Sequence, residues 1–362
     1  MRPRSAVAGK RDPGKMLHRA LGDSPEAVAG TVRRLQHFGR TMTYRFKLQE
    51  PIGQAVRRVG LEQIEIATAK LAGTDDIAIA IHDARRCLKR LRALLRLIEP
   101  GLGEAQYRRE AARLAGIGRL LSGARDLEVM RQTLGKLESR FHALPAGATD
   151  RLATFLAQSQ AHGATDGRRR ALLRLEQSKR FFAAKATAGI ELGHVIEGLG
   201  RAYRKARKAF RHAYREPHED AFHACRKRVQ LHWRHMALLT RGWPEALSAR
   251  ASEAKEMSRL LGEDHDYAVL LDLARKRGKS ILEPGDLEAL TALCTACQAK
   301  LRAAARPRGD RLFAEPVRNL ESRVARYWRS AQCLANFATG EGRPGALHEP
   351  SAKVKNVPNR KR

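Results

Sequence analysis

Residues 81–100 read IHDARRCLKRLRALLRLIEP, and their pattern of apolar and basic residues indicates the fold class. Successive residues of an α-helix advance by about 100° around its axis. On such a helix, one side collects the apolar residues Cys87, Leu88, Leu91, Leu94, Leu95 and Ile98. The other side collects the basic residues His82, Arg85, Arg86, Lys89 and Arg96, flanked by Arg90 and Arg92. The stretch therefore predicts an amphipathic helix with an apolar face in the core and a basic face outside it.

The rest of the chain predicts further helices and no strands. No run of residues alternates between apolar and polar with the period of two that a half-buried strand requires. The Thr-Asp-Asp sequence at 74–76 is expected to cap the quoted helix, and Ser24 marks another helix start near the N-terminus. Further helices are expected near 104–122, 126–141, 150–186, 189–215, 217–240, 244–261, 266–278, 284–304 and 311–337. We therefore predict an all-α fold.

Two motifs occur twice, in the same order and at nearly the same offset. H-x-x-R-[RK] at residues 82–86 recurs 141 residues later, at 223–227. RLLSGARDLEVM at 119–130 recurs as RLLGEDHDYAVL at 259–270, an offset of 140. This pattern predicts two pseudo-symmetric helical bundles of the four-helix type, packed around a basic central cavity.

The predicted organisation has three parts. Residues 1–49 form a basic, partly helical N-terminal extension. Residues 50–337 form the repeated helical domain, with halves at about 50–188 and 189–337. Residues 338–362 are rich in Gly, Pro and basic residues, and we expect this tail to be disordered.

The whole chain is strongly basic. Its 362 residues include 70 Lys and Arg against 38 Asp and Glu, a formal net charge of +32. This charge indicates a polyanionic partner, namely nucleic acid, an anionic membrane surface or inorganic polyphosphate. Residues 1–20 contain no apolar run typical of a secretory signal, and no stretch has the roughly 20 apolar residues of a membrane span. Five cysteines, mostly in apolar helical positions, are typical of a reduced cytoplasmic protein, so we expect that location and no membrane partner.

Two further predicted helices carry basic faces of a single sign. In the segment 190–214 the face consists of Arg201, Arg204, Lys205, Lys208, Arg211 and His212. In the second copy of the repeat it consists of His223, Arg226, Lys227 and Arg234. Like charges at i, i+3 and i+4 repel one another, and we expect no acid to relieve them. Solvated helix faces normally mix both signs, so the three faces together predict one common groove that binds an anion.

The ordered set of motifs resembles the CHAD family, the conserved-histidine α-helical domain. The resemblance rests on H-x-x-R-[RK] opening a basic helix, on a later L-x-x-x-R-D-type turn, and on the repetition of both after about 140 residues. YRKARKAF at 203–210, just before the second histidine motif, also fits the family. The resemblance covers residues from about 50 to 337 and implies two helical bundles around a basic cavity that binds inorganic polyphosphate. We therefore expect binding without catalysis or a cofactor, and association with polyphosphate granules.

The predicted polyphosphate-binding residues come from this resemblance and from the basic faces. They are His82, Arg85, Arg86, Lys89, Arg92, Arg201, Arg204, Arg207, Lys208, Arg211, His223, Arg226, Lys227 and Arg234. The second half departs from the family pattern, because Gln230 and Trp233 stand where a Lys and an Arg are expected. Arg234 is expected to supply the missing charge. A histidine beside phosphates has a raised pKa, so binding should tighten below about pH 6.5.

A nucleic-acid-binding protein is the first alternative, since it would also need a high positive charge. Aromatic residues make up only 5% of the chain and do not alternate with basic ones as base-stacking platforms would. We therefore expect only weak, non-specific binding of nucleic acid.

A metal-dependent phosphohydrolase is the next alternative. The acidic cluster at 263–266 could hold Mg²⁺, but we interpret it as a helix cap with Asp266 at the helix start. H-x-x-H at 232–235 and C-x-x-C at 294–297 have the spacing of metal ligands. We interpret both as core residues inside helices, so we predict neither an enzyme nor a metal site.

Overall fold

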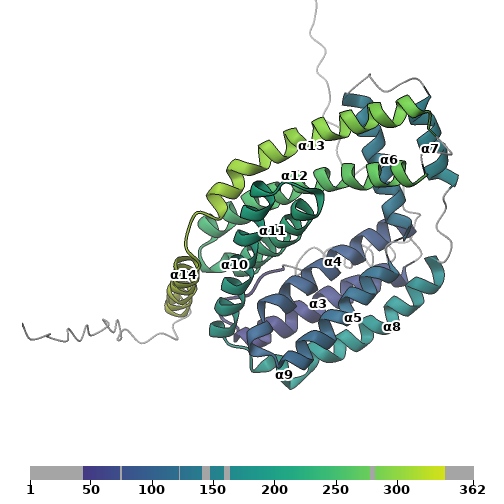
Figure 1. Ribbon diagram of the computed structural model, residues 1–362. Coiled ribbons are helices and arrows are strands. Elements are labelled where there is room, and N and C mark those ends of the chain that lie inside the picture. Colours follow the sequence, from purple (N-terminus) through teal and green to yellow (C-terminus); the bar gives the residue numbers. More distant parts are fainter. Residues whose placement is uncertain are drawn as a thin grey trace, which may run out of the picture. The chain divides into compact units, whose positions relative to one another are not determined.

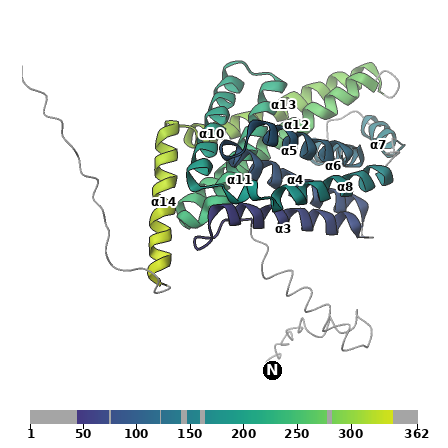
Figure 2. The same ribbon diagram turned by 90° about the horizontal axis from the view of Figure 1, so that it is seen from below.

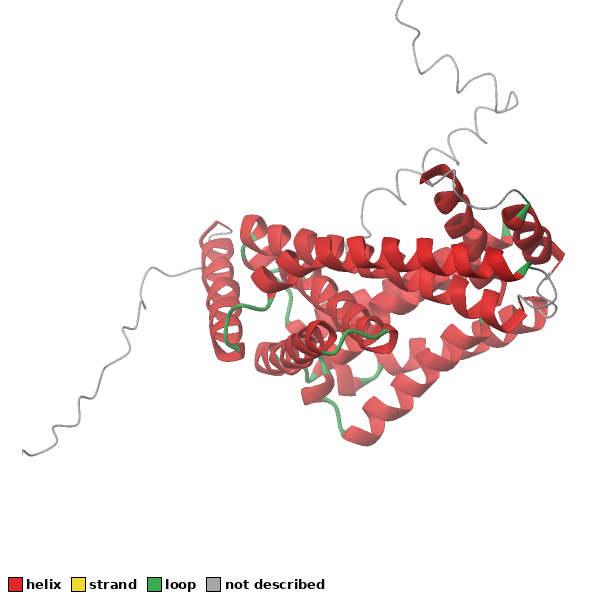
Figure 3. Ribbon diagram, turned by 45° about the horizontal axis from the view of Figure 1, so that its top comes forward, coloured by secondary structure: helices red, strands yellow, loops and turns green. Residues whose placement is uncertain are grey.

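The structure, a computed structural model, describes residues 44–73, 76–121, 123–140, 147–158, 164–277 and 282–338. Every regular element in these ranges is a helix, which confirms the predicted all-α fold (Figure 3). The predicted helix start at Ser24 and the predicted disordered tail lie outside the described residues. None of the described helices is long and apolar enough to span a lipid bilayer.

The helices follow one another with short connections. In chain order they are α3 (Ile52–Ala72), α4 (Ile77–Leu97), α5 (Glu104–Leu120), α6 (Gly123–Arg140), α7 (Ala148–Gln158), α8 (Ala164–Ala183), α9 (Lys185–Ala188), α10 (Leu192–Arg215), α11 (Glu219–Leu239), α12 (Pro244–Arg277), α13 (Pro284–Leu312) and α14 (Val317–Ala338). Two 3-10 turns, η1 (Glu99–Gly101) and η2 (Thr240–Gly242), follow α4 and α11.

These helices pack in two groups that α4 joins. In the first group α3 and α5 each pack against both α4 and α8, in the lower part of Figure 1. In the second group α11 packs between α10 and α12, and α12 packs against α13. α14 packs against α10 and lies across the other helices in Figure 2. Because α4 contacts both α10 and α11, this helix lies where the two groups meet.

α4 has the two faces that its sequence predicts. The Asp76 carboxylate caps its N-terminus by accepting hydrogen bonds from the backbone N–H groups of Ala78 and Ile79, at 2.8 and 3.4 Å. The six predicted apolar residues, from Cys87 to Ile98, are at most 3% exposed. Burying a large apolar side chain contributes roughly 1.5–3 kcal/mol. The burial of these apolar side chains fixes the orientation of α4 and therefore of its basic face.

Several predicted helix boundaries are wrong. α12 runs unbroken from Pro244 to Arg277, where the sequence predicts two helices, 244–261 and 266–278. Leu261, Tyr267 and Leu271 are all buried, and this continuous apolar stripe stabilises one long helix across the expected break. The single helix predicted at 150–186 is divided into α7 and α8. α13 continues through its internal proline to Leu312, so α14 begins later than predicted.

Residues 44–49, which were predicted to belong to the N-terminal extension, pack into the helical unit. Tyr44 and Phe46 are buried, and the backbone N–H of Phe46 donates to the carbonyl oxygen of Leu238 at 2.9 Å. The Tyr44 hydroxyl donates to the carbonyl oxygen of Arg90 in α4, also at 2.9 Å. The helical unit therefore starts at Tyr44.

The two helix groups come into backbone contact at Gly198 of α10. A Cβ atom added to Gly198 would lie 1.8 Å from the carbonyl oxygen of Leu97 in α4. A Cβ atom added to Gly193, in the first turn of the same helix, would have no atom within 4 Å. The close approach of α10 to α4 thus requires glycine at position 198 and not at position 193.

Gly198→Ala is therefore expected to lower the free energy of unfolding by about 1–3 kcal/mol, because the two backbones have to move apart. Gly193→Ala is the matched control, and it should leave the stability unchanged or raise it by up to about 1 kcal/mol. Urea unfolding of both variants measures the difference. Equal stability of the two variants would show that the helices do not meet as described.

Candidate anion-binding site

A cavity of about 860 Å³ lies between α4 and α11, and residues of both helix groups line it. We call it the basic cavity. Its cationic and histidine lining consists of Arg85, Lys89, Arg92 and Arg96 from α4, His223, Arg226, Lys227, Arg228 and Arg234 from α11, and His265 from α12. Asp220 and Asp266 are the acids among its lining residues. Side chains from both halves of the sequence repeat thus converge on one space with an excess of positive charge.

Seven of the fourteen predicted site residues lie in this cavity. They are Arg85, Lys89, Arg92, His223, Arg226, Lys227 and Arg234. Gln230, which stands at the repeat position of Lys89, also lines it, and Arg234 on the same helix supplies a cation nearby. The structure therefore places the two copies of the histidine motif around a common cavity, although His82 of the first copy is not among its lining residues.

Arg85 has a structural task besides its place in the cavity. One guanidinium nitrogen, Nη1, donates to the carbonyl oxygens of Gly118 and Leu121, at 3.1 and 2.9 Å. These carbonyls belong to the C-terminal end of α5, where backbone acceptors lack partners within the helix. Replacing Arg85 would therefore disturb the fold as well as the cavity, which makes Lys89 and Lys227 better positions for testing binding.

Arg234 is the most deeply buried cation of the cavity, with a relative exposure of 6%. Its Nη1 donates to the carbonyl oxygen of Gln230 at 2.8 Å, its guanidinium lies 4.1 Å from the ring centre of Trp233, and its Nε has no hydrogen-bond partner. No ion pair joins it to an acid in the described ranges. Burial and the neighbouring cation Arg90 lower the pKa of Arg234 to about 10. This buried charge is costly unless an anion enters the cavity.

Other cations in the cavity are also destabilised by burial and by one another. Partial desolvation, with repulsion from Arg96 and Arg119, lowers the pKa of Arg92, although this side chain is exposed at the rim of the cavity. Burial and Arg96 likewise lower the pKa of Arg228. Since the attraction of a bound anion would offset both effects, the electrostatics favour an occupied cavity.

Two histidines stack in the same cavity. The ring centres of His223 and His265 lie 3.9 Å apart, with the ring planes inclined by 33°. Burial, Lys227 and Arg226 lower the pKa of His223, although Asp220 opposes them. Burial, His223 and the same two cations lower the pKa of His265 to about 3. Both rings are therefore neutral at pH 7 in the protein without a ligand.

Three predicted site residues line neither the basic cavity nor the groove described next. The Arg86 guanidinium pairs with the Asp83 carboxylate at 3.2 Å, and His82 lies 3.7 Å from the same acid. Arg201 pairs with Glu197 at 2.6 Å. The prediction of basic faces without relieving acids is wrong at these points, because an acid on the same helix, either adjacent or about one turn away, reaches each of these side chains.

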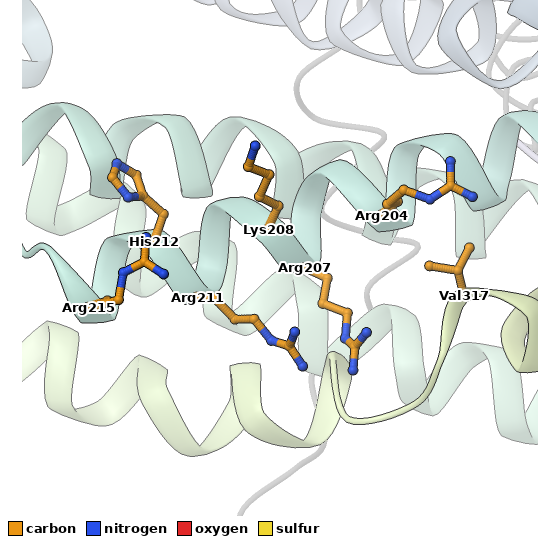
Figure 4. Close-up of a pocket in the computed structure, with 7 residues that line it drawn as sticks. All are labelled: Arg204, Arg207, Lys208, Arg211, His212, Arg215 and Val317. Carbon is orange, nitrogen blue, oxygen red and sulfur yellow. The ribbon is translucent and has the colours of Figure 1, made fainter.

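The remaining four predicted residues lie in a separate groove along α10. This groove has a volume of about 290 Å³ and is lined by Arg204, Arg207, Lys208, Arg211, His212, Arg215 and Val317 (Figure 4). We call it the α10 groove, and it shares no lining residue with the basic cavity. The prediction of one common groove for all three basic helices is therefore wrong. The apolar face of α10 explains this result. Tyr203 and Phe210 pack against Phe313, so the basic residues lie on the remaining surface of the helix and not in the cavity.

Three cavity residues were missed by sequence reasoning. Arg96 lies on the predicted basic face but is not among the fourteen predicted site residues. Arg228 stands at the repeat position of Cys87, so the repeat predicts an apolar residue there. His265 belongs to the segment interpreted as a helix cap. Its position next to Asp266 in the second copy of the L-x-x-x-R-D-type motif was the available signal.

The cap interpretation of the 263–266 cluster is wrong, because α12 passes through it without interruption. Its members also do not converge on one point. Glu263 pairs with Arg259 at 3.3 Å and Asp264 pairs with Arg302 at 2.6 Å, whereas His265 and Asp266 line the cavity. Within the described ranges, no group of three or more His, Cys, Asp or Glu is arranged to hold a metal ion.

The other two motifs with metal-ligand spacing are core residues, as the sequence analysis interprets them. His232 is buried, and its Nε2 accepts a hydrogen bond from the Nε of Arg250 at 3.1 Å. The Nε2 of His235 lies 2.9 Å from the carbonyl oxygen of Ala93. Cys294 and Cys297 are both buried in the core.

The fold and the site together define an all-α protein with a cation-lined cavity between two helix groups. Residues 60–275 match the model of the CHAD domain, so the chain belongs to the CHAD domain family. Among solved structures, the chain is similar to the crystal structure of the CHAD domain from the plant Ricinus communis. That match has 19% identity and a TM-score of 0.45, and it covers 75% of this chain and 93% of the plant domain. A search of curated proteins found no match.

Proposed function

We propose that this protein binds inorganic polyphosphate in the basic cavity and catalyses no reaction on it. The observation that best supports the proposal is the buried Arg234, which has no acidic partner in the described part of the chain and lies among further cations. Bringing so many like charges together destabilises the ligand-free protein. A bound polyanion would offset this cost. The membership of the CHAD domain family agrees with a binding role.

Polyphosphate suits these side chains better than other polyanions do. It carries about one charge per phosphate along a thin, flexible chain and offers no bases to recognise. The planar guanidinium of arginine can donate two hydrogen bonds to a pair of phosphate oxygens, and the lysine ammonium group contributes a point charge. Tyr107 is the aromatic residue other than histidine in the cavity lining, so the cavity offers little for stacking several bases. We further propose that this binding brings the protein to polyphosphate granules.

A competition titration at about 150 mM salt, which screens loose surface contacts, tests the proposal. Labelled long-chain polyphosphate bound to the protein is challenged with duplex DNA, single-stranded RNA or orthophosphate. Unlabelled polyphosphate should compete at concentrations at least about 100-fold lower than any of them. Lys89→Gln/Lys227→Gln should weaken binding by about 10-fold or more, since each charged contact contributes roughly 1 kcal/mol or more.

Lys179→Gln/Lys255→Gln is the matched control, because it removes two exposed lysines that line neither the cavity nor the groove. It should bind as tightly as the wild type. Equal competition by DNA or RNA, together with unchanged binding by the cavity variant, would refute the proposal and favour non-specific nucleic-acid binding.

Binding should also tighten as the pH falls from 7.5 to 5.5. Both stacked histidines are neutral without a ligand, and adjacent phosphates would raise the pKa of each. The bound state therefore takes up protons, and affinity rises as the pH falls through the raised pKa. The titration uses long polyphosphate chains at a fixed salt concentration, so that protonation of their terminal phosphates makes a negligible contribution to the pH dependence. His223→Gln/His265→Gln should flatten the dependence, whereas an unchanged pH profile in that variant would exclude the histidine pair as its source.

A further inference from the structure

The α10 groove and the basic cavity share no lining residue and differ in their chemistry. Asp220 and Asp266 line the cavity along with its cations, whereas the groove is lined by cations, one histidine and Val317. Arg204, Lys208 and Arg211 are exposed, and none of them forms an ion pair with an acid in the described ranges. Glu216 pairs with His212 and Arg215 at the C-terminal end of α10. This acid therefore contacts only the part of the groove that lies along the last turn of the helix.

The groove has a defined wall, which distinguishes it from a mobile charged surface. The Nε of Arg207 donates to the carbonyl oxygen of Phe313 at 2.9 Å, which fixes α10 against the segment between α13 and α14. Val317, the first residue of α14, closes one side (Figure 4). The groove is therefore held by the same contacts that bury the apolar face of α10.

The arrangement of the charges fits a linear anion. From Arg204 to Arg215 the helix advances about 16 Å, at a rise of about 1.5 Å per residue. Arg204, Lys208, Arg211 and Arg215 recur every three or four residues and so form one stripe along this length. No aromatic side chain other than a histidine lines the groove, so it lacks a platform on which bases could stack.

We propose that the α10 groove is a second polyphosphate-binding site and that the protein is bivalent, so that one molecule joins two phosphate chains. This inference rests on the proposed function of the basic cavity and adds a second, separate site to it. Two sites on one folded unit would bind long chains with avidity and would cross-link them into a network. A protein with this property would condense polyphosphate as well as bind to it.

A bridging assay tests the bivalency. The full-length protein is captured on beads that carry short polyphosphate chains, which limits the occupation of both sites by one chain. After washing, fluorescent polyphosphate is added and the amount retained by the bead-bound protein is measured. The wild type should retain it. Arg204→Gln/Lys208→Gln/Arg211→Gln should still bind the beads through the cavity but lose at least about 80% of the retained fluorescence, since it loses three of the contacts that hold the second chain.

The matched control is Arg109→Gln/Arg169→Gln/Lys255→Gln, which removes the same charge from exposed positions outside both sites. It should bridge as the wild type does. Bridging by the groove variant at the wild-type level, or its loss in the control variant, would overturn the bivalent model. Failure of the wild type to bridge while it still binds the beads would overturn the second site alone. Failure to bind the beads at all would instead refute the proposed function itself.

Discussion

Arg234→Met is expected to raise the free energy of unfolding of the ligand-free protein and, at the same time, to weaken polyphosphate binding. Burial lowers the pKa of Arg234 to about 10, which corresponds to a cost of roughly 3 kcal/mol for holding the charged form in this position. Removing the charge also removes the cation–π contact with Trp233, at a loss of about 0.5–1 kcal/mol. The net stabilisation should therefore be about 2 kcal/mol.

The loss of binding follows from the same side chain. A hydrogen bond between charged groups contributes about 1.5–3 kcal/mol, so affinity should fall by roughly 10- to 100-fold. Urea unfolding without ligand and titration with polyphosphate measure the two effects on one preparation. Arg241→Met is the control, because Arg241 is exposed just beyond α11 and lines neither the cavity nor the groove. If Arg234→Met destabilised the ligand-free protein and bound normally, the buried charge would serve the fold and not the ligand.

Polyphosphate affinity should fall steeply with salt concentration. Each cation that contacts a phosphate releases condensed counterions, which lowers the slope of log K against log[salt] by about 0.7–0.9 per contact for nucleic acids. The basic cavity offers enough cations for six or more contacts. Raising the salt from about 50 to 200 mM should then weaken binding by roughly 1,000-fold or more.

Lys89→Gln/Lys227→Gln should make this slope shallower by about 1.4–1.8, since two contacts are lost. The slope of Lys179→Gln/Lys255→Gln should match that of the wild type. Fluorescence titrations at four or five salt concentrations give all three slopes. If both double variants changed the slope equally, binding would depend on the total charge of the protein and the cavity would have no special role.

The sequence predicts the fold class and much of the cavity because both depend on local periodicity. The apolar and basic faces of α4 follow from residue spacing alone, and burial of Leu91 and Leu94 confirms the assignment. The repeat indicates which side chains of α11 correspond to those of α4, and these residues do meet around one cavity. The spacing of motifs along the chain was sufficient for this part of the site.

Features that depend on contacts between distant segments could not be predicted in this way. Arg85 donates to backbone carbonyls 33 and 36 residues away, which no motif reveals. The basic face of α10 points away from the cavity because Phe313, about 100 residues later, covers the opposite side of the helix. Arg234 was expected to replace a missing charge, but its buried position beside Tyr44 joins two segments that are far apart in the sequence.

A crystal structure of the protein with polyphosphate bound would show whether the phosphate chain occupies the basic cavity. The account predicts a continuous run of phosphate density through the basic cavity, with oxygen atoms within hydrogen-bonding distance of Arg92, Lys227 and Arg234. The guanidinium of Arg234, which lines the cavity, should gain a phosphate partner. An empty cavity in a complex whose phosphates lie only on other surfaces would contradict the account.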